Sequence, residues 1–375
     1  MRATAVGLTL AAATPTVAAI LAVAAILAGC ATGGAPGRTT PPDARTTQSG
    51  IAADSATASA QSGVAQREAR ARALLAMGDL DGAAEELRAL LRQSPDDVQA
   101  RYALAVALMA KQDWPSARSE LDGVLRRQPD MVPALYSLGL VGYAQGDLNG
   151  AIEAYRQVLA RNPEHADARY NLGLLLKLTH RDAEATPEFV AAARAGHARA
   201  QFFAGTAYAR GLGVEPDLAR AIAWWSRAAE QGSLESGAAL AELRQAALGK
   251  VRRAPAERRA VEQAFRDYRA GLWSDYPELA KSGDEDTVGA ALLRQDRGGE
   301  AVPVLISEAL AFSEPAQALL EDLYKRGAHG QVLPHDARIL SYFKTAAAEG
   351  QVRAQRVLQE ISAAAETAPP SPVRP

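Results

Sequence analysis

The pattern of apolar and polar positions between residues 64 and 362 is helical almost throughout. Large apolar side chains recur at helical spacing, among them Leu104, Leu121, Leu138, Tyr155, Leu172 and Phe189. A second set of positions holds small residues, in pairs twelve apart: Ala71 with Ala83, Ala105 with Ala117, Gly139 with Ala151, and Gly173 with Ala185. Small side chains let two helix axes approach closely, while the larger ones fill the core between neighbouring helices. The pattern predicts an all-α fold built of helical hairpins.

The same pattern returns every 34 residues. Three residue types share this spacing: Pro95, Pro129 and Pro163; Asp79, Asp113 and Asp147; and Tyr102, Tyr136 and Tyr170. Gly78 with Asp79 predicts the turn inside a hairpin, as does Gly146 with Asp147, and each proline prevents the second helix from continuing. Residues 64–197 therefore resemble four tetratricopeptide repeats, and the resemblance implies a right-handed α-solenoid.

The fourth repeat departs from this pattern. His180 and Arg181 replace the Gly-Asp turn, and His197 stands where the proline is expected. From Ala198 to Gly232 the chain resembles the Sel-one-like repeat, with Gly205, Tyr208, Gly211, Gly213, Asp217, Ala221 and Trp224 at matching positions. A second copy is expected at Ala316–Gly350. Trp224, Trp225, Tyr342 and Phe343 occupy repeat-core positions, so we expect them to be buried.

The segment between the two Sel-one-like copies is harder to interpret. Helical patterns cover Leu234–Ala247, Ala256–Arg269, Glu285–Gln295 and Ala301–Phe312, with breaks near Pro255, Pro277 and Gly298. Two interpretations stay open for residues 233–315. They are degenerate hairpins that continue the same superhelix within residues 198–362, or an insertion specific to the task of this protein.

A solenoid of this kind is expected to have nearest-neighbour contacts, a long concave surface and no single pocket. By resemblance to the family, positions five, nine and twelve of each first helix line the concave groove. The expected partner-binding residues are Tyr102, Val106, Met109, Tyr136, Leu140, Tyr143, Tyr170, Asn171, Leu174 and Lys177. Tyrosine offers apolar area together with a hydroxyl, which suits an extended peptide or a partner helix. The alternative is that these tyrosines pack against the next repeat.

The N-terminal residues have the layout of an export signal. Arg2 is followed by a run of twelve apolar residues from Val17 to Ala28, which is shorter than the roughly 20 residues of a membrane-spanning helix. Leu27, Ala28, Gly29 and Cys30 resemble the bacterial lipobox, which implies acylation of Cys30 after removal of residues 1–29. The alternative is a plain secretory signal. Ala31 after the cysteine favours the outer membrane by resemblance to lipoprotein sorting. Residues 30–63 are rich in Gly, Thr, Ser, Ala and Pro and predict a flexible tether, and residues 363–375 a second disordered end.

The composition and the types of residue present argue against several classes of function. The formal net charge of −2 argues against a nucleic-acid partner, and the single cysteine excludes a disulfide framework. The histidines, His165, His180, His197, His329 and His335, are scattered, with no metal-ligand spacing. The sequence contains no phosphate-binding glycine loop, no nucleophile elbow and no Cys-His pair, so we expect no enzyme, no metal and no cofactor.

Three functions fit these features. The first is a lipid-anchored scaffold on the periplasmic face of the outer membrane, which binds protein partners in an envelope assembly or export machine. The second is a periplasmic glycan-binding module for exopolysaccharide export, with the tyrosines stacking on sugar rings. The third is a regulator of a peptidoglycan hydrolase, active through its partner.

Overall fold

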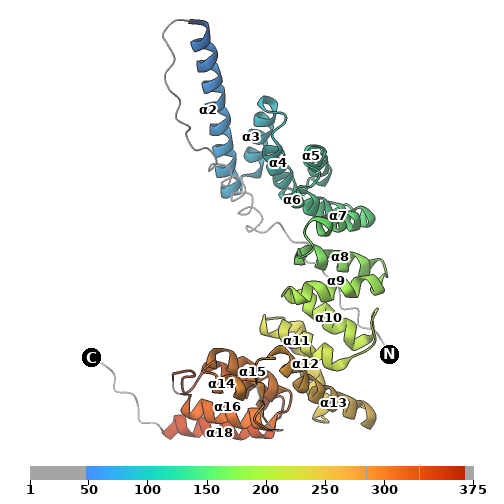
Figure 1. The fold of residues 1–375 in the computed structure, drawn as a ribbon, viewed down its shortest axis with the longest axis vertical. Helices are drawn as coiled ribbons and strands as arrows, with labels where there is room; N and C mark the ends of the chain where they lie inside the picture. Colours follow the sequence, from blue (N-terminus) through green and yellow to red (C-terminus); the bar gives the residue numbers. More distant parts are fainter. Residues whose placement is uncertain (1–47, 280, 284–285, 329, 368–375) are drawn as a thin grey trace, which may run out of the picture. The chain divides into compact units, whose positions relative to one another are not determined.

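The computed structural model describes residues 48–279, 281–283, 286–328 and 330–367, and their regular structure is helical (Figure 1). Within these residues the extended pairing is limited to an isolated bridge between Ala328 and Val332. The predicted all-α solenoid class is confirmed. The expected signal peptide, residues 1–29, and the expected lipidation site, Cys30, lie outside the described residues.

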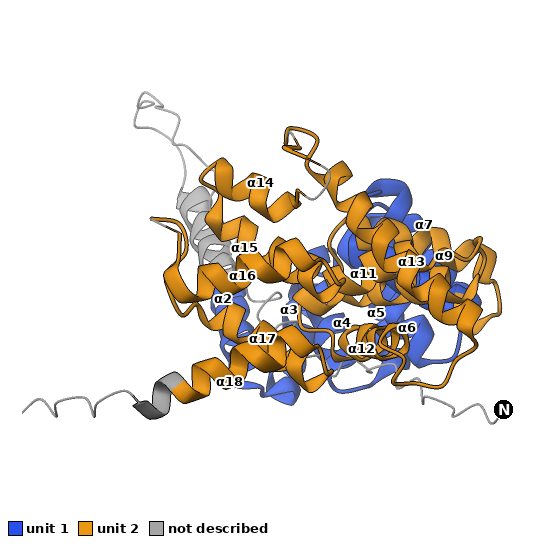
Figure 2. Ribbon diagram, turned by 90° about the horizontal axis from the view of Figure 1, so that it is seen from below, with its two compact units in different colours: residues 1–176 blue, residues 177–375 orange. Residues whose placement is uncertain are grey.

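The chain divides into two compact units, residues 1–176 and 177–375 (Figure 2). The helices of unit 1 are α2 (Gln48–Met77), α3 (Leu80–Gln93), α4 (Val98–Ala110), α5 (Trp114–Arg127), α6 (Val132–Ala144), α7 (Leu148–Arg161) and most of α8 (Ala166–Leu178). Unit 2 contains α9 (Asp182–Arg194), α10 (Ala198–Arg210), α11 (Leu218–Glu230), α12 (Leu234–Ala247), α13 (Pro255–Leu272), the short 3₁₀ helix η2 (Trp273–Asp275), α14 (Val288–Arg294), α15 (Gly298–Leu310), α16 (Glu314–Arg326), α17 (Ala337–Ala348) and α18 (Val352–Thr367). The division falls inside α8, whereas the sequence changes repeat type near residue 197.

The turns inside the unit 1 hairpins follow one local rule. The aspartates at 34-residue spacing are N-caps: Asp79 accepts from the Gly82 amide at 2.9 Å and Asp147 from the Gly150 amide at 2.9 Å. That bond, more than the nearby Arg118, lowers the pKa of Asp147. Such a cap satisfies amide donors that the first helical turn leaves unpaired. Helices α3, α5 and α7 each end two residues before a proline of the 34-residue series.

The residue before each cap position has a positive φ angle. Gly78 and Gly146 have φ of +79° and +78°, but the same position is held by Gln112 at +61° and by His180 at +58°. A side chain is strained in this left-handed region, where glycine is not. Two of the four turns thus carry a residue that is not the best for its backbone conformation.

The second Sel-one-like copy, α16 with α17, repeats one polar contact of the first copy, α10 with α11. Gln201 donates to the carbonyl of Ala193 at 3.3 Å, and Gln317 donates to the carbonyl of Ala309 at 3.2 Å. The glycines that follow α10 and α16, Gly211 and Gly327, have φ of +69° and +71°. The ψ angles of these glycines differ, at +37° for Gly211 and −173° for Gly327, so the two hairpins share a polar contact and a positive φ but not one turn conformation.

The expected tether differs from the structure over part of its length. Residues 30–47 lie outside the described residues, but from Gln48 onward the chain is helical as part of α2. The prolines of this region, Pro36, Pro41 and Pro42, all precede Gln48, and residues 48–63 are rich in alanine, the strongest helix former. At the other end, α18 continues to Thr367, so residues 363–367 of the expected disordered tail are helical.

The helices predicted between residues 233 and 315 are present as α12 to α15, but unit 2 is not limited to nearest-neighbour contacts. Arg244 on α12 donates to both carboxylate oxygens of Glu349, the C-cap of α17, at 2.6 and 2.5 Å. These two residues are 105 positions apart, and both side chains are buried. The expectation of nearest-neighbour contacts alone is therefore wrong for unit 2. Helices after the segment 276–287 also contact earlier ones, since Ser307 on α15 bonds to Glu230 on α11 and the Phe312 ring packs against Phe265 on α13.

The turn geometry gives a prediction about stability. We expect Gln112→Gly to raise the free energy of unfolding by about 0.5–1 kcal/mol, because relief of the strained φ outweighs the added entropy of the unfolded chain. The Gln112 side chain is exposed, so little packing is lost. Urea denaturation followed by circular dichroism measures the change.

Gly146→Ala is the matched control for this prediction. A Cβ atom at Gly146 would meet nothing within 4 Å, so the substitution tests backbone strain without a steric clash. It should lower the free energy of unfolding by a similar amount. A Gln112→Gly protein less stable than the parent would show that φ strain does not limit this turn.

Candidate functional site

The tyrosines of the expected groove connect successive repeats. Tyr102 on α4 is only 7% exposed, and its hydroxyl lies 3.3 Å from Ser137 Oγ on α6. Burial raises the pKa of Tyr102. One repeat later, the Tyr136 hydroxyl accepts from Asn171 Nδ2 at 3.0 Å. Both contacts join residues 35 positions apart, so a tyrosine hydroxyl bonds to the following repeat at two successive repeat junctions.

The Tyr136 ring is enclosed by aromatic neighbours. It stacks on His165 with ring centroids 5.1 Å apart and lies tilted against Tyr155 at 5.6 Å. Burial, followed by the charge of Asp167, raises the pKa of Tyr136 to about 12. Tyr102 and Tyr136 therefore contact the next repeat, as the alternative interpretation of the tyrosines expected.

Other residues of the expected groove remain partly accessible. Val106 and Met109 on α4, and Leu140 and Tyr143 on α6, are half-buried side chains at equivalent positions of two successive first helices. We call these four residues the α4–α6 face. Tyr170 and Asn171 on α8 are also half-buried, whereas Leu174 is buried. Lys177 belongs to unit 2 and lies 3.9 Å from Asp182 Oδ1.

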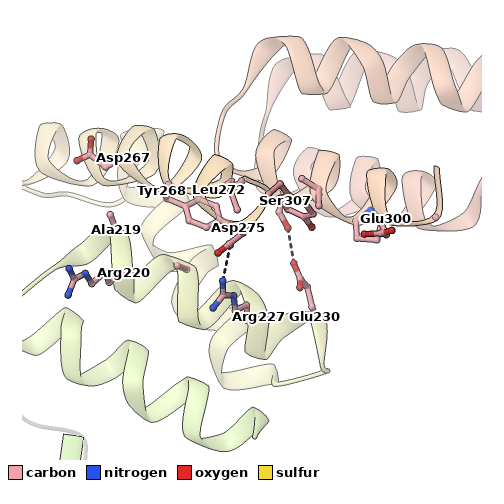
Figure 3. Close-up of a pocket in the computed structure, with 16 residues that line it drawn as sticks. Ala219, Arg220, Arg227, Glu230, Asp267, Tyr268, Leu272, Asp275, Glu300 and Ser307 are labelled. Carbon is pink, nitrogen blue, oxygen red and sulfur yellow. Dashed lines mark hydrogen bonds and ion pairs between the residues drawn. The ribbon is translucent and has the colours of Figure 1, made fainter. Parts of the chain in front are cut away.

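Unit 2 contains a pocket that the sequence did not predict. Its volume is about 540 Å³, and it is lined by side chains from α11, α13, η2 and α15 (Figure 3). We call it the α11–α15 pocket. The expectation that the chain has no single pocket is wrong here, since the pocket forms where the hairpins after the 276–287 linker meet α11 and α13.

Two polar bridges cross the α11–α15 pocket. Arg227 on α11 donates to Asp275 of η2 at 2.8 Å, and Ser307 on α15 donates to Glu230 on α11 at 2.9 Å. Figure 3 shows Arg227 and Glu230 pointing from α11 toward the α13 and α15 side of the pocket. Tyr268 forms a buried part of the wall, and this burial raises its pKa to about 12 despite hydrogen bonding with Ser226.

Two of the histidines have a structural role in the described part of the chain. His165 and His197 accept the amides of Ala168 and Ala200 through Nδ1, which makes them helix N-caps. Within the described residues no group of three or more His, Cys, Asp or Glu is placed to hold a metal ion. Trp224, Trp225, Tyr342 and Phe343 are buried, which confirms the prediction that they belong to the core.

Glu308 is a buried carboxyl group that the sequence did not single out. It lies on α15, is 3% exposed, and accepts the backbone amides of Val288 and Gly289 at 2.8 and 3.2 Å. Thr287 caps the amide of Ala290, so the first turn of α14 is satisfied by two side chains. Burial raises the pKa of Glu308 to about 7, although the two amides and Arg269 favour its charged form.

The chain matches models of two repeat families. Residues 74–138 match a tetratricopeptide repeat model, residues 139–179 match a second TPR model, and residues 198–233 match a Sel1 repeat model. No curated protein matches the chain.

Several solved structures are similar in fold. A Sel1 repeat protein from Oxalobacter formigenes is 22% identical, with coverage of 87% of this chain and 98% of that one and a TM-score of 0.42. The pilF protein of Pseudomonas aeruginosa is 19% identical over 58% of this chain and 94% of its own, with a TM-score of 0.43. MamA from Desulfovibrio magneticus RS-1 is 20% identical over 45% and 94%, with a TM-score of 0.41.

Glu308 predicts a pH dependence of stability. Between about pH 4.5 and 7 the folded protein retains a proton on Glu308 that the unfolded chain has released, so the free energy of unfolding falls as the pH rises. Across this pH range the titration of Glu308 lowers the free energy of unfolding by about 3 kcal/mol in total. Urea denaturation at pH 5, 6, 7 and 8 measures it.

Glu308→Gln should flatten this dependence, because the amide does not titrate. The exposed residue Glu314, in the first turn of α16, provides the matched control Glu314→Gln, which should leave the slope unchanged. Identical slopes for the parent and Glu308→Gln would contradict the assignment.

Proposed function

We propose that this tetratricopeptide and Sel1 repeat protein is a lipid-anchored scaffold that holds protein partners at the periplasmic face of a bacterial outer membrane. Repeats of these two types bind protein partners through extended surfaces. The envelope location, the anchor and the role in an assembly or export machine are the specific parts of the proposal. We propose no catalytic activity for the chain itself.

The α4–α6 face is the observation that carries the protein-binding part. Val106 and Met109 present apolar surface on α4, and Leu140 and Tyr143 present it at the equivalent positions of α6. An apolar strip on the first helices of two successive repeats suits an amphipathic helix or an extended peptide, whose apolar side chains gain free energy by leaving water.

The same geometry favours a protein partner over a glycan. Stacking on sugar rings requires exposed aromatic faces, but Tyr102 is buried and the Tyr136 ring is covered by His165. Regulation of a peptidoglycan hydrolase would be one form of protein binding, and identification of the partner would distinguish it from a structural scaffold.

The anchor is supported by the sequence around Cys30. The apolar run Val17–Ala28 ends in Gly29 and Cys30, and a thiol at this place is the acylation point of bacterial lipoproteins. Two or more acyl chains hold a protein stably on a bilayer, at about 0.8 kcal/mol per buried methylene. Among the described helices, none combines the length and apolar character needed to cross a membrane.

Cys30→Ser tests the anchor. We expect the variant to leave the membrane fraction and to lose incorporation of radiolabelled palmitate, because no thiol remains to be acylated. Thr32→Ser, two residues away, should behave like the parent. A Cys30→Ser protein that stays in the membrane pellet after a high-salt wash would refute the anchor.

Leu140→Glu tests the α4–α6 face. A charge in the middle of an apolar contact must be desolvated, so partner recovery after crosslinking and detergent extraction should fall about tenfold. Asn149→Glu adds the same charge at an exposed position of α7 and should have no effect. Equal recovery with Leu140→Glu and with the parent, at equal thermal stability, would rule out this face.

A further inference from the structure

The α11–α15 pocket lies where the regular stacking of hairpins is interrupted. Its walls come from α11 on one side and from α13, η2 and α15 on the other. In the sequence, residues 276–287 lie between η2 and the hairpin that contains α15. A volume of about 540 Å³ falls within the roughly 300–1,000 Å³ that is typical of ligand pockets. This is room for a few side chains of a bound segment.

The two cationic side chains of the pocket are already neutralised. Arg227 pairs with Asp275 at 2.8 Å, and its guanidinium lies 5.1 Å from the centre of the Trp224 ring. Arg220 pairs with Asp217 at 3.1 Å and lies 5.5 Å from the Tyr208 ring. Neither guanidinium is therefore an open site for an anion.

Two of the four carboxylates that line the pocket receive only neutral donors among their hydrogen bonds. Glu230 accepts from the Ser307 hydroxyl at 2.9 Å, and Asp267 accepts from Gln263 Nε2 at 2.7 Å. The other two, Asp275 and Glu300, pair with arginines. Burial raises the pKa of Glu230, although the charge of Arg227 favours its ionised form. The four carboxylates of the lining outnumber its two arginines, so the pocket has an excess of negative charge.

Apolar surface adjoins this charge. Ala223 on α11, Leu272 on α13, and Pro303 and Val304 on α15 line the pocket together with the polar groups. A lysine or arginine side chain combines a long aliphatic stem with a terminal cation, so it complements both parts of this lining.

We propose that the α11–α15 pocket binds a lysine or arginine side chain carried by an extended segment of a partner protein. The inference rests on the proposed scaffold function, and it adds a second, basic contact to the apolar contact on the α4–α6 face. The cation would lie against Glu230, with its aliphatic stem along Ala223 and Val304.

Thiol chemistry at Ala223 tests the charge preference of the pocket. In the full chain carrying Cys30→Ser, Ala223→Cys supplies the only thiol. We expect a cationic methanethiosulfonate reagent to modify it faster than an anionic one. The reference is a thiol at the exposed position Ala256→Cys. At low salt the ratio of the cationic to the anionic rate should be about tenfold higher for the pocket thiol than for the reference thiol, because a negative pocket concentrates cations.

Glu230→Gln should remove most of this preference. Glu257→Gln, on an exposed residue of α13, is the matched control and should preserve it. A rate ratio that is unchanged by Glu230→Gln, or a pocket thiol that reacts faster with the anionic reagent, would overturn the proposal.

Protection by peptides tests the nature of the occupant. Three twelve-residue peptides of repeating Gly-Ala-Xaa, with Xaa as lysine, norleucine or glutamate, are compared for slowing the modification of the Ala223→Cys thiol. We expect protection by the lysine peptide alone. Equal protection by the norleucine peptide would show that the pocket does not recognise the positive charge and would overturn the proposal. These assays use purified protein, so a negative result leaves the Cys30→Ser and Leu140→Glu experiments unaffected.

Discussion

The close approach of two helix axes at glycine and alanine positions is the constraint on which the hairpins depend. A Cβ atom at Gly139 would lie 2.6 Å from the Tyr155 ring, and one at Gly205 would lie 2.6 Å from the Trp225 ring. A large aromatic side chain fits between two helices only because the facing residue has no side chain. Overpacking of such a site costs about 1–3 kcal/mol, so the glycine and its aromatic partner act as one unit. The helix pair then presents a fixed outer surface to the next repeat.

Polar links between repeats set how each hairpin lies on its neighbour. The hydroxyls of Tyr102 and Tyr136 reach Ser137 and Asn171 of the following repeat, and Gln201 and Gln317 reach carbonyls at the end of the preceding helix. Buried polar groups of this kind must find partners, which disfavours other arrangements of the hairpins. The tyrosines therefore stabilise repeat junctions, and the residues left for a partner are the apolar ones beside them.

Local features of the fold were predictable from the sequence because short-range physics determines them. Asp79, Asp113 and Asp147 mark helix starts, the prolines of the same period mark helix ends, and the four helices between residues 233 and 315 follow from apolar spacing. The first part of α2, residues 48–63, was not predicted, because composition favoured a flexible segment while alanine propensity favours a helix. The strained turn at Gln112 was also hidden, since only its position relative to Gly78 and Gly146 indicates the positive φ.

The long-range features of unit 2 leave no periodic signal. The α11–α15 pocket joins residues 48 and 77 positions apart, as in Arg227 with Asp275 and Glu230 with Ser307. Arg244 with Glu349 closes a still longer span. Such pairs cannot be read from spacing, because they depend on which hairpins meet in the folded chain. Glu308 on α15 was missed because the amides that it accepts belong to a different helix, α14.

Charge has different roles in the two regions that we assign to binding. The α4–α6 face itself consists of apolar and aromatic side chains. The α11–α15 pocket is crossed by an ion pair and a carboxylate–hydroxyl bond, and the buried Arg244–Glu349 pair joins α12 to the end of α17. Loss of one partner from a buried pair leaves an uncompensated charge at about 3–5 kcal/mol, whereas exposed pairs such as Arg227 with Asp275 contribute about 1 kcal/mol or less. The buried pair therefore holds the C-terminal hairpins against α12, while Glu230 can exchange its bond with Ser307 for an incoming cation at little cost in stability.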